Sequence, residues 1–281
     1  MHMSVRSEDT SPDSGTERLL PAGRKADLAA YVAEVGQVTV ARLTKRFGVS
    51  ADTVRRDLDQ LDADGVLIRT HGGAVSLTAF PKLDTGLADR QRVQASAKER
   101  IGELVADLVP NGASLVINAG TTTLAVVRHL REHRDLTIAT NSLAVSGEIN
   151  PSAVRDLYVF GGAVRLSAQA TVGPVAFPGT FGGGDVSIRS DFALICVGAV
   201  SARAGYSTSN LAEAAMMHEM MTQATQVIVM ADSAKFNRRM FAQVAELDRA
   251  DWFVTDSAPP DELGEALHTG GVEIVIPKDA E

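Results

Sequence analysis

Apolar residues recur at helical spacing through residues 24–74, and they predict three short amphipathic helices followed by a small hairpin. Thr39 stands where a cap of the second helix is expected, and Gly48 stands where that helix should end in the left-handed conformation. Only Val49 separates Gly48 from Ser50, the expected cap of the third helix, so the link is a tight turn. Helix–turn–helix units of this kind place the helix after the turn in the major groove of DNA. The pattern therefore predicts a DNA-binding unit.

The third predicted helix carries basic side chains opposite its buried stripe. Val54 and Leu58 are expected in the core, and at about 100° per residue Arg56 then lies nearly opposite them. Arg55 and Thr53 lie on the two flanks of Arg56. An arginine in this place can bind guanine through two hydrogen bonds or hold a phosphate, and the sequence leaves both open. A solvated helix face is the alternative for an arginine pair, but the helix–turn–helix context favours contact with DNA.

Strand-like and helix-like patterns alternate from about residue 94 to the C-terminus. This alternation predicts a mainly parallel α/β sheet with helices on both faces. Ligands in such sheets usually bind outside the carboxyl ends of the strands. The strands are expected at 114–117, 136–140, 156–160, 192–197, 226–231, 252–255 and 272–276, and the helices at 95–109, from about 122, and at 210–224.

Four polar loops follow predicted strands and should therefore meet at one edge of the sheet. The first, 118–123 (NAGTTT), opens a helix whose free amides can bind an anion, and it is no P-loop because no Gly-Lys-Ser/Thr follows. The others are 140–142 (TNS), 161–165 (GGAVR) and 231–236 (ADSAKF), which supply amide, guanidinium, carboxylate and ammonium groups for a phosphate or polyol. Each loop alone also fits an ordinary polar turn or helix cap. Four of them at one edge favour a binding site.

Net charge divides the chain along the same line as the patterns. The whole chain carries −8, whereas residues 21–76 hold eight Lys or Arg against seven Asp or Glu. An acidic protein binds DNA only if its few cations converge on one face, so non-specific affinity should be modest. We therefore expect a disordered tail at 1–20, a DNA-binding domain at 21–76, a linker at 77–93 and an α/β domain at 94–281.

Cysteine use and hydropathy indicate a cytoplasmic location. The single cysteine, Cys196, lies in an apolar run and is expected to pack in the core rather than act as a nucleophile. No apolar run approaches the ~20 residues that span a bilayer, and the N-terminus has no signal-peptide pattern. His129 and His133 lie one turn apart, but arginines flank them and no third metal ligand is evident. The Gly-rich stretch 177–189 is either a mobile lid or a loose loop, and we favour the loop.

The N-terminal stretch resembles the signature of the DeoR family of transcriptional regulators. The resemblance rests on residues 50–58 (SADTVRRDL), on Arg24, Leu28 and Val32 before them, and on 70–74 (THGGA) after them. It implies a winged helix–turn–helix, with residues 66–71 in the wing. The implied DNA contacts fall on Ser50, Thr53, Arg55 and Arg56 and, more loosely, on Lys45, Arg46, Arg69 and His71.

The C-terminal part resembles the sensor domain of the same family, which is similar to the sugar-phosphate isomerase and CoA-transferase group of α/β folds. The resemblance rests, in chain order, on INAGTTT, TNS, FGGAVR, TVGPVA, GYST, EAAMMHEMM and ADSAKF. It implies a phosphorylated sugar or related metabolite as effector. The implied effector contacts are Asn118, Gly120, Thr121, Thr122, Thr123, Asn141, Gly162, Arg165, Asp232 and Lys235.

Two positions depart from the family pattern. An acidic residue is common where this chain has Asn118, and a lysine is common where Met217 stands beside His218. Loss of a carboxylate changes the hydrogen bonding to a sugar hydroxyl, and loss of an ammonium removes an anion contact. The effector is therefore expected to be unusual or less highly charged.

The function expected from these observations is that of a ligand-responsive transcriptional repressor of a carbohydrate-metabolism operon. It should bind double-stranded operator DNA as a homo-oligomer, a dimer or tetramer, without cofactor, metal, membrane or enzymatic activity. The alternative is a sugar-phosphate isomerase-like enzyme with an appended DNA-binding domain, in which Asp232 and Lys235 serve acid–base chemistry. Against the enzyme, the loops show one obvious carboxylate and no pair. A third possibility is an architectural DNA binder with a vestigial sensor.

Overall fold

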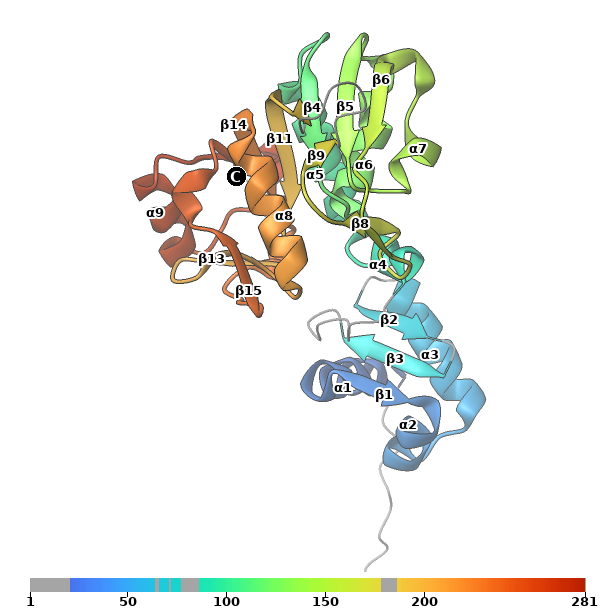
Figure 1. Ribbon diagram of the computed structural model, residues 1–281. Coiled ribbons are helices and arrows are strands. Elements are labelled where there is room, and N and C mark those ends of the chain that lie inside the picture. The colour runs from blue at the N-terminus through green and yellow to red at the C-terminus, as the bar shows by residue number, and fades with distance from the viewer. Residues whose placement is uncertain (1–20, 64–65, 71, 77–85, 178–185, 281) are drawn as a thin grey trace, which may run out of the picture. The chain divides into compact units, whose positions relative to one another are not determined.

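The chain divides between residues 79 and 80 into two units, each with its own core, in the computed structural model (Figure 1). The structure describes residues 21–63, 66–70, 72–76, 86–177 and 186–280. The predicted tail at 1–20, His71 and most of the predicted linker lie outside these residues.

The N-terminal unit is a winged helix–turn–helix. Leu28, Leu43, Val54 and Leu58, one or more from each of its three helices, are fully buried and form its core. The short strand β1 was not predicted, and it joins the wing in a three-stranded antiparallel sheet of order β1-β3-β2. The elements are α1 (Pro21–Val35), β1 (Gln37–Thr39), α2 (Val40–Phe47), α3 (Ala51–Ala63), β2 (Leu67–Thr70) and β3 (Gly73–Ser76).

The predicted caps and the glycine-rich exit of this unit have clear structural causes. The Thr39 hydroxyl accepts the Arg42 amide at 3.3 Å, and Gly48 ends α2 with a φ of 64°. Gly73 pairs with Thr39 across the sheet, where a Cβ would lie 1.9 Å from the Val38 carbonyl oxygen. The exit from the wing therefore needs glycine for close approach of two backbones.

A buried ion pair joins the first and third helices of the N-terminal unit. Arg24 Nε on α1 donates to Asp57 Oδ2 on α3 at 2.7 Å, and both side chains are largely buried. The hydrogen bond to Asp57 raises the pKa of Arg24, against the effect of desolvation. This pair explains the presence of Arg24 and Asp57 in the motif without any contact to DNA.

The C-terminal unit is built on a parallel sheet of seven strands in the order β17-β16-β14-β11-β4-β5-β6. Its strands begin and end within two residues of the predicted bounds. They are β4 (Ser114–Ile117), β5 (Leu136–Thr140), β6 (Val154–Val159), β11 (Ser190–Cys196), β14 (Ala224–Met230), β16 (Trp252–Val254) and β17 (Glu273–Val275).

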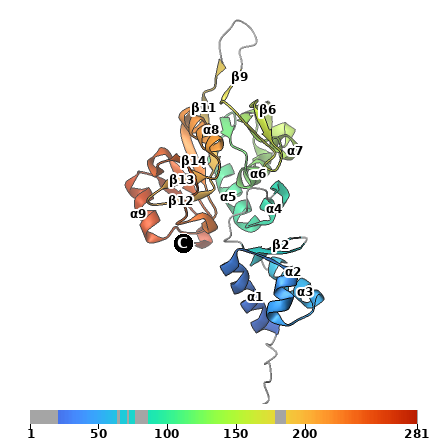
Figure 2. The same ribbon diagram turned by 60° about the horizontal axis from the view of Figure 1, so that its bottom comes forward.

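Helices cover both faces of this sheet, as predicted, and Figures 1 and 2 show α8 and the α5–α6 pair on opposite sides of the central strands. On β4, Leu115 and Ile117 belong to the core cluster that also holds residues of α5 and α6, whereas Val116 belongs to the cluster that holds residues of α8 and α9. The apolar runs of the central strands follow from burial on both faces. The helices are α5 (Ala95–Leu108), α6 (Thr121–His129), α7 (Val145–Glu148), α8 (Leu211–Thr222) and α9 (Asp261–Thr269).

Smaller elements surround the sheet. Helix α4 (Leu87–Arg92) lies inside the predicted linker and is anchored by buried Leu87. Strands β7 (Ala163–Arg165) and β8 (Ala170–Val172) form one hairpin, and β9 (Ala176–Phe177) pairs with β10 (Val186–Ser187) at the two ends of the predicted 177–189 loop. A three-stranded sheet holds β12 (Ala199–Ser201), β13 (Gly205–Thr208) and β15 (Ala242–Ala245), and 3-10 turns lie at Leu130–Glu132, Pro151–Ala153, Ser233–Lys235, Leu247–Arg249 and Lys278–Ala280.

Within the described part of the chain, none of the helices combines the length and the apolar character that a membrane crossing requires.

Candidate nucleic-acid interface and ligand site

Helix α3 presents the predicted DNA-contacting side chains on its exposed face. The Ser50 hydroxyl caps the helix by accepting the Thr53 amide at 3.2 Å, and the two hydroxyl oxygens lie 2.9 Å apart. Arg55 is held by Asp52 at 2.9 Å, with both side chains exposed. Arg56 is also exposed, and it forms no ion pair with a described residue. Arg56 is therefore the predicted guanidinium best placed to bind an external group.

Some of the remaining predicted DNA contacts already interact with other residues of the protein, and others do not. Arg46 lies over the Tyr31 ring at 4.0 Å from its centroid, whereas Lys45 is exposed. Arg69 in the wing is bonded to Asp59 on α3, and its amide donates to Asp62 at 2.9 Å.

Arg42 was not predicted as a contact. It is exposed on α2 and lies 5.8 Å from the centre of the Tyr31 ring. The sequence signal was its spacing, since Arg42 and Arg46 are one helical turn apart.

The predicted ligand loops all follow carboxyl ends of parallel strands, and the first of them opens helix α6. The first hydrogen bond of the helix runs from the Leu124 amide to the Gly120 carbonyl oxygen, so the amides of residues 121–123 precede the regular pattern. Thr122 is fully buried, and its hydroxyl has no hydrogen-bond partner among the described residues. Buried hydroxyls are normally paired, so the Thr122 hydroxyl departs from the usual pattern.

Gly120 allows the loop to pass close to the end of β11. A Cβ built on Gly120 would lie 2.0 Å from the Sγ atom of buried Cys196. Its φ of 178° is ordinary extended backbone, so close approach and not backbone strain requires the glycine here. Cys196 packs in the core as predicted, and it also lines the back of this loop.

Two predicted effector contacts, Asn118 and Asn141, use their side-chain amides to hold strand ends together. Asn118 accepts from the Cys196 amide at 2.8 Å and donates to the Cys196 carbonyl at 2.9 Å. Asn141 accepts from the Ala119 amide at 2.7 Å and donates to the Thr171 carbonyl at 2.8 Å. A carboxylate at residue 118 has no proton to donate to the Cys196 carbonyl, so the asparagine suits this pairing.

The arginine of the glycine-rich loop after β6 contacts helix α8. Arg165 forms an ion pair with Glu213 on the first turn of α8, and both side chains are mostly buried. Gly162 has a φ of 138°, and a Cβ there would lie 2.4 Å from the Val172 carbonyl oxygen. The structure thus gives Arg165 a carboxylate partner within the protein.

The loop after β14 carries the second predicted group of charges. Lys235 Nζ lies 3.4 Å from Asp232 Oδ2, and Asp232 is buried. Asp256 holds the intervening Ser233 by accepting its amide at 2.7 Å and its hydroxyl at 3.0 Å. The turn is therefore fixed by the next strand-end loop, and Lys235 adds a positive charge to it.

Lys98 on α5 is a second group that was not predicted from the sequence. It is 5% exposed, and its ammonium donates to the carbonyl oxygens of Arg90, at 2.6 Å, and Val93. Burial, followed by repulsion from Lys235, lowers the pKa of Lys98 to about 7. The signal was its spacing, because Lys98 falls on the stripe of Ile101 and Val105.

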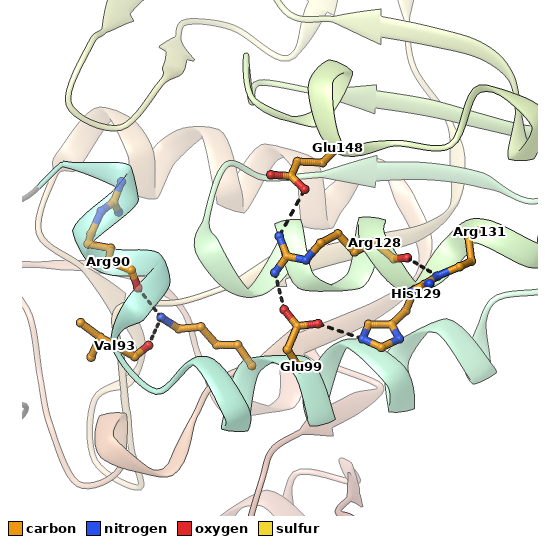
Figure 3. A network of polar contacts seen from close by, with 8 residues as sticks. Arg90, Val93, Glu99, Arg128, His129, Arg131 and Glu148 are labelled. Atoms are coloured by element: carbon orange, nitrogen blue, oxygen red, sulfur yellow. Dashed lines mark hydrogen bonds and ion pairs between the residues drawn. The ribbon is translucent and has the colours of Figure 1, made fainter. Parts of the chain in front are cut away.

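A separate polar network, which includes His129, joins α5, α6 and α7 (Figure 3). Glu99 binds Arg128 and also His129, the latter at 3.0 Å, and Arg128 reaches Glu148 at 3.5 Å. Burial disfavours the charge on Glu99, but the bonds from Arg128 and His129 together keep its pKa below the ordinary value. His133 instead faces backbone carbonyls, so the pair does not converge, and the described residues contain no group of three metal-ligating side chains.

Family models match both units of the chain. The DeoR-like helix-turn-helix domain matches residues 24–80, and the DeoR C terminal sensor domain matches residues 93–257. The HTH-type transcriptional repressor CsqR of Escherichia coli is 30% identical over 91% of this chain and 95% of that protein. The HTH-type transcriptional regulator GlpR of Haloferax volcanii is 31% identical over 92% and 98%, and the glycerol-3-phosphate regulon repressor of E. coli is 28% identical over 87% and 94%.

Solved structures with low sequence identity are similar to parts of the chain. Ribose 5-phosphate isomerase A from Methanocaldococcus jannaschii gives a TM-score of 0.35 at 12% identity over 50% of this chain and 54% of that one. The tetrameric eIF2B-beta2-delta2 complex from C. thermophilum gives 0.41 at 14% identity over 89% and 88%. Both scores are too low to carry an argument, so the fold rests on the strand order of this chain.

The winged helix–turn–helix, taken with the relatives named above, identifies a DNA-binding transcriptional regulator. The family models and the relatives identify it further. The chain belongs to the DeoR family.

Proposed function

We propose that this protein represses an operon of carbohydrate metabolism and that a phosphorylated sugar or related metabolite controls its affinity for the operator. Helix α3 is the DNA-reading element, and Arg56 is its principal contact. The effector binds at the carboxyl edge of the parallel sheet, between the start of α6 and Lys235. The protein acts in the cytoplasm as a homo-oligomer whose two-fold symmetry matches paired half-sites.

One observation carries the effector part of this proposal: the buried hydroxyl of Thr122, unpaired among the described residues, lies on the helix terminus that follows Gly120. Lys98 and Lys235, which repel one another, supply two cations near the adjoining strand ends. Free amides, an unpaired hydroxyl and two ammonium groups form the donor set that a phosphate prefers. Asn118 and Asn141 then act by holding this loop in place.

The names of the relatives support repression. CsqR and the glycerol-3-phosphate regulon repressor are both named as repressors, and the second name points to a phosphorylated three-carbon compound. The enzyme alternative finds less support, because Asp232 is buried and forms an ion pair with Lys235, so it has a partner within the protein. A turnover assay with pentose and hexose phosphates tests that alternative directly.

A thermal-shift screen tests the proposed effector. The full-length protein is heated with phosphorylated sugars, with the same sugars lacking phosphate, and with inorganic phosphate. A true effector at 100 times its Kd stabilises the protein by about 2.7 kcal/mol, and the shift grows with the logarithm of concentration. Lys235→Met should reduce the shift, whereas Lys278→Met, which removes an exposed lysine, should not. Equal shifts in both variants would contradict the site.

A compound that stabilises the protein is then tested for its effect on DNA binding. Operator DNA is obtained by selection from a random pool with the protein itself, and its Kd is measured with and without this compound. A repressor controlled by this ligand shows a Kd that changes with ligand concentration. An unchanged operator Kd at saturating ligand would leave a DNA binder without a working sensor.

A further inference from the structure

The positive charge of the winged unit gathers on helix α2 and not on helix α3. Helix α2 carries three exposed cations, Arg42, Lys45 and Arg46, and no acidic residue. Helix α3 carries four aspartates against two arginines, which gives it a net charge of −2. Proteins gain sequence-independent affinity for DNA by neutralising its phosphates with lysine and arginine. A helix that is itself acidic supplies little of this attraction, so another element has to supply it.

Ion pairs within the unit sharpen this division. Three pairs lie in the described part of the winged unit, and they hold arginines of α1, α3 and β2: Arg24–Asp57, Arg55–Asp52 and Arg69–Asp59. The three cations of α2 form no ion pair with a described residue, and the same holds for Lys25 and Arg56. The uncompensated positive charge of the described winged unit is therefore concentrated on α2.

An aromatic ring of helix α1 contacts two of these cations. Arg42 and Arg46 are one turn apart on α2, and their ζ-carbons lie 5.8 Å and 4.0 Å from the centre of the Tyr31 ring. The ring of Phe47 meets Tyr31 edge-on, with 6.2 Å between the ring centres. Cations at these distances are attracted to the ring face. Two like charges that would repel one another at this spacing are thus held side by side.

This arrangement leaves the hydrogen-bonding groups of both arginines available. The five N–H donors of a guanidinium lie in its plane, so a guanidinium that packs on a ring keeps its donors for another partner. Neither the Arg42 nor the Arg46 guanidinium donates to a described residue. The guanidinium fork matches two oxygens of a phosphate. In helix–turn–helix proteins the helix before the recognition helix crosses the DNA backbone, and α2 occupies that place here.

We propose that Tyr31 is a positioning residue for DNA binding: its ring holds Arg42 and Arg46 so that both bind phosphates of the DNA backbone. Helix α2 then sets the strength of sequence-independent binding and its dependence on salt, whereas the preference for the operator depends on α3. This inference rests on the DNA-binding part of the proposed function. Phosphate contacts carry no sequence information, so α2 should contribute equally to the binding of every duplex.

Titrations of the full-length protein test the phosphate contacts. Two duplexes of equal length, the selected operator and a random sequence, are bound at several salt concentrations. Arg42→Gln and Arg46→Gln should each weaken both duplexes by the same factor and make the slope of log K against log salt shallower by about 0.9. The ratio of the two affinities should stay as in the wild type. Arg134→Gln, which removes the same charge from an exposed position of the C-terminal unit, should leave both slopes unchanged.

A double-mutant cycle tests the role of the ring. Tyr31→Leu removes the ring and should weaken both duplexes about two- to tenfold, because the two arginines lose their partner and must be ordered on binding. Tyr31→Phe keeps the ring and should bind as the wild type does. In a chain that already carries Arg42→Gln and Arg46→Gln, Tyr31→Leu should have no further effect on either Kd. A purely structural role of Tyr31 would not depend on the two arginines.

The outcomes separate this inference from the proposed function. Equal losses from Tyr31→Leu with and without the two arginines would overturn the positioning role. Wild-type slopes in both arginine variants would overturn the phosphate contacts and leave DNA binding through α3 standing. A wild-type protein that binds neither duplex at low salt would overturn both proposals. If Tyr31→Leu does not fold, pentafluorophenylalanine in place of Tyr31 decides, because it keeps the ring shape but removes the attraction for cations. Wild-type affinity in that variant would contradict the inference.

Discussion

At the scale of single residues, the closest approach in the proposed ligand site is between Gly120 and Cys196. A side chain on Gly120 would meet the Cys196 sulfur at 2.0 Å but the Cys196 Cβ only at 3.7 Å, which is ordinary contact. We therefore expect Gly120→Ala to lower the free energy of unfolding by about 1–3 kcal/mol, as in other overpacked sites. In a Cys196→Ala background the same change should cost clearly less.

A double-mutant cycle by urea denaturation measures this relation. Relief in the double variant shows that the sulfur sets the need for glycine. Strictly additive losses would show instead that Gly120 is required for another reason, such as the path of its own backbone.

Lys98 should give the protein a distinct dependence of stability on pH. Its native pKa is about 7, against an ordinary 10.5, so between these values the unfolded chain binds a proton that the native chain lacks. The free energy of unfolding then rises with pH across that window, by up to about 1.4 kcal/mol per pH unit. Below pH 7 Lys98 is protonated in both states, so it no longer makes stability change with pH. Lys98→Met should flatten the rise between pH 7.5 and 9.5 in denaturation experiments, and Arg100→Met should not. Parallel curves for wild type and Lys98→Met would be evidence against the lowered pKa.

Residue types at the loops were predictable from sequence, but the partners of those residues were not. Asn118 and Asn141 stand at strand ends as expected, yet their amides are bonded to backbone groups more than 20 residues away in the chain. Arg165 likewise pairs with Glu213 on a helix that follows much later. Lys98 was not predicted because it lies on a helix, among the apolar residues that face the core, and not in a loop at a strand end.

At the scale of elements, helices α5 and α6 approach one another through a glycine. A Cβ on Gly102 of α5 would lie 2.8 Å from the Ala125 carbonyl carbon and 3.0 Å from its oxygen on α6. Gly102→Ala should therefore push the helices apart and cost about 1–3 kcal/mol in unfolding free energy. Gly147 of α7 offers a matched control, because nothing lies within 4 Å of a Cβ there.

In equilibrium unfolding, Gly147→Ala should be neutral or stabilising by up to about 1 kcal/mol, since alanine favours helices over glycine. Similar losses of unfolding free energy in Gly102→Ala and Gly147→Ala would mean that the α5–α6 contact can accommodate a methyl group.

Elements with strong periodicity were predicted within a few residues, and weak ones were not. The strands of the parallel sheet are buried on both faces, so their apolar runs stand out from the sequence. Strand β1 has three residues and exists only through its pairing with β3. Helix α4 has six residues, and its C-terminal end is held by Lys98 rather than by a local signal. Both depend on contacts that are distant in sequence.

At the scale of the whole molecule, the net charge of −8 restricts how the protein binds DNA. The winged unit has few cations, and Arg55 and Arg69 already pair with Asp52 and Asp59. We therefore expect operator affinity to depend strongly on Arg56. Arg56→Ala should weaken binding to selected operator DNA by about 1–3 kcal/mol, while the ligand-induced thermal shift stays the same.

The salt dependence of that loss decides which contact Arg56 makes. If it binds a phosphate, the slope of log K against log salt falls by about 0.9 in the variant, and if it binds a base the slope is unchanged. Arg155→Ala, which removes an exposed arginine of the sensor domain, is the control. An Arg56 variant with full operator affinity at every salt concentration would remove this residue from recognition.

The single cysteine also gives the protein a built-in chemical reporter. Cys196 is 8% exposed, so in the native state a thiol reagent reaches it slowly. A cysteine introduced on the surface is then labelled alone, and dyes can be placed on either unit without first removing the native thiol. The labelling rate of Cys196 itself measures how often the loop at Gly120 opens. A ligand that fills this loop should slow that reaction, which turns a simple colour assay into a screen for the effector.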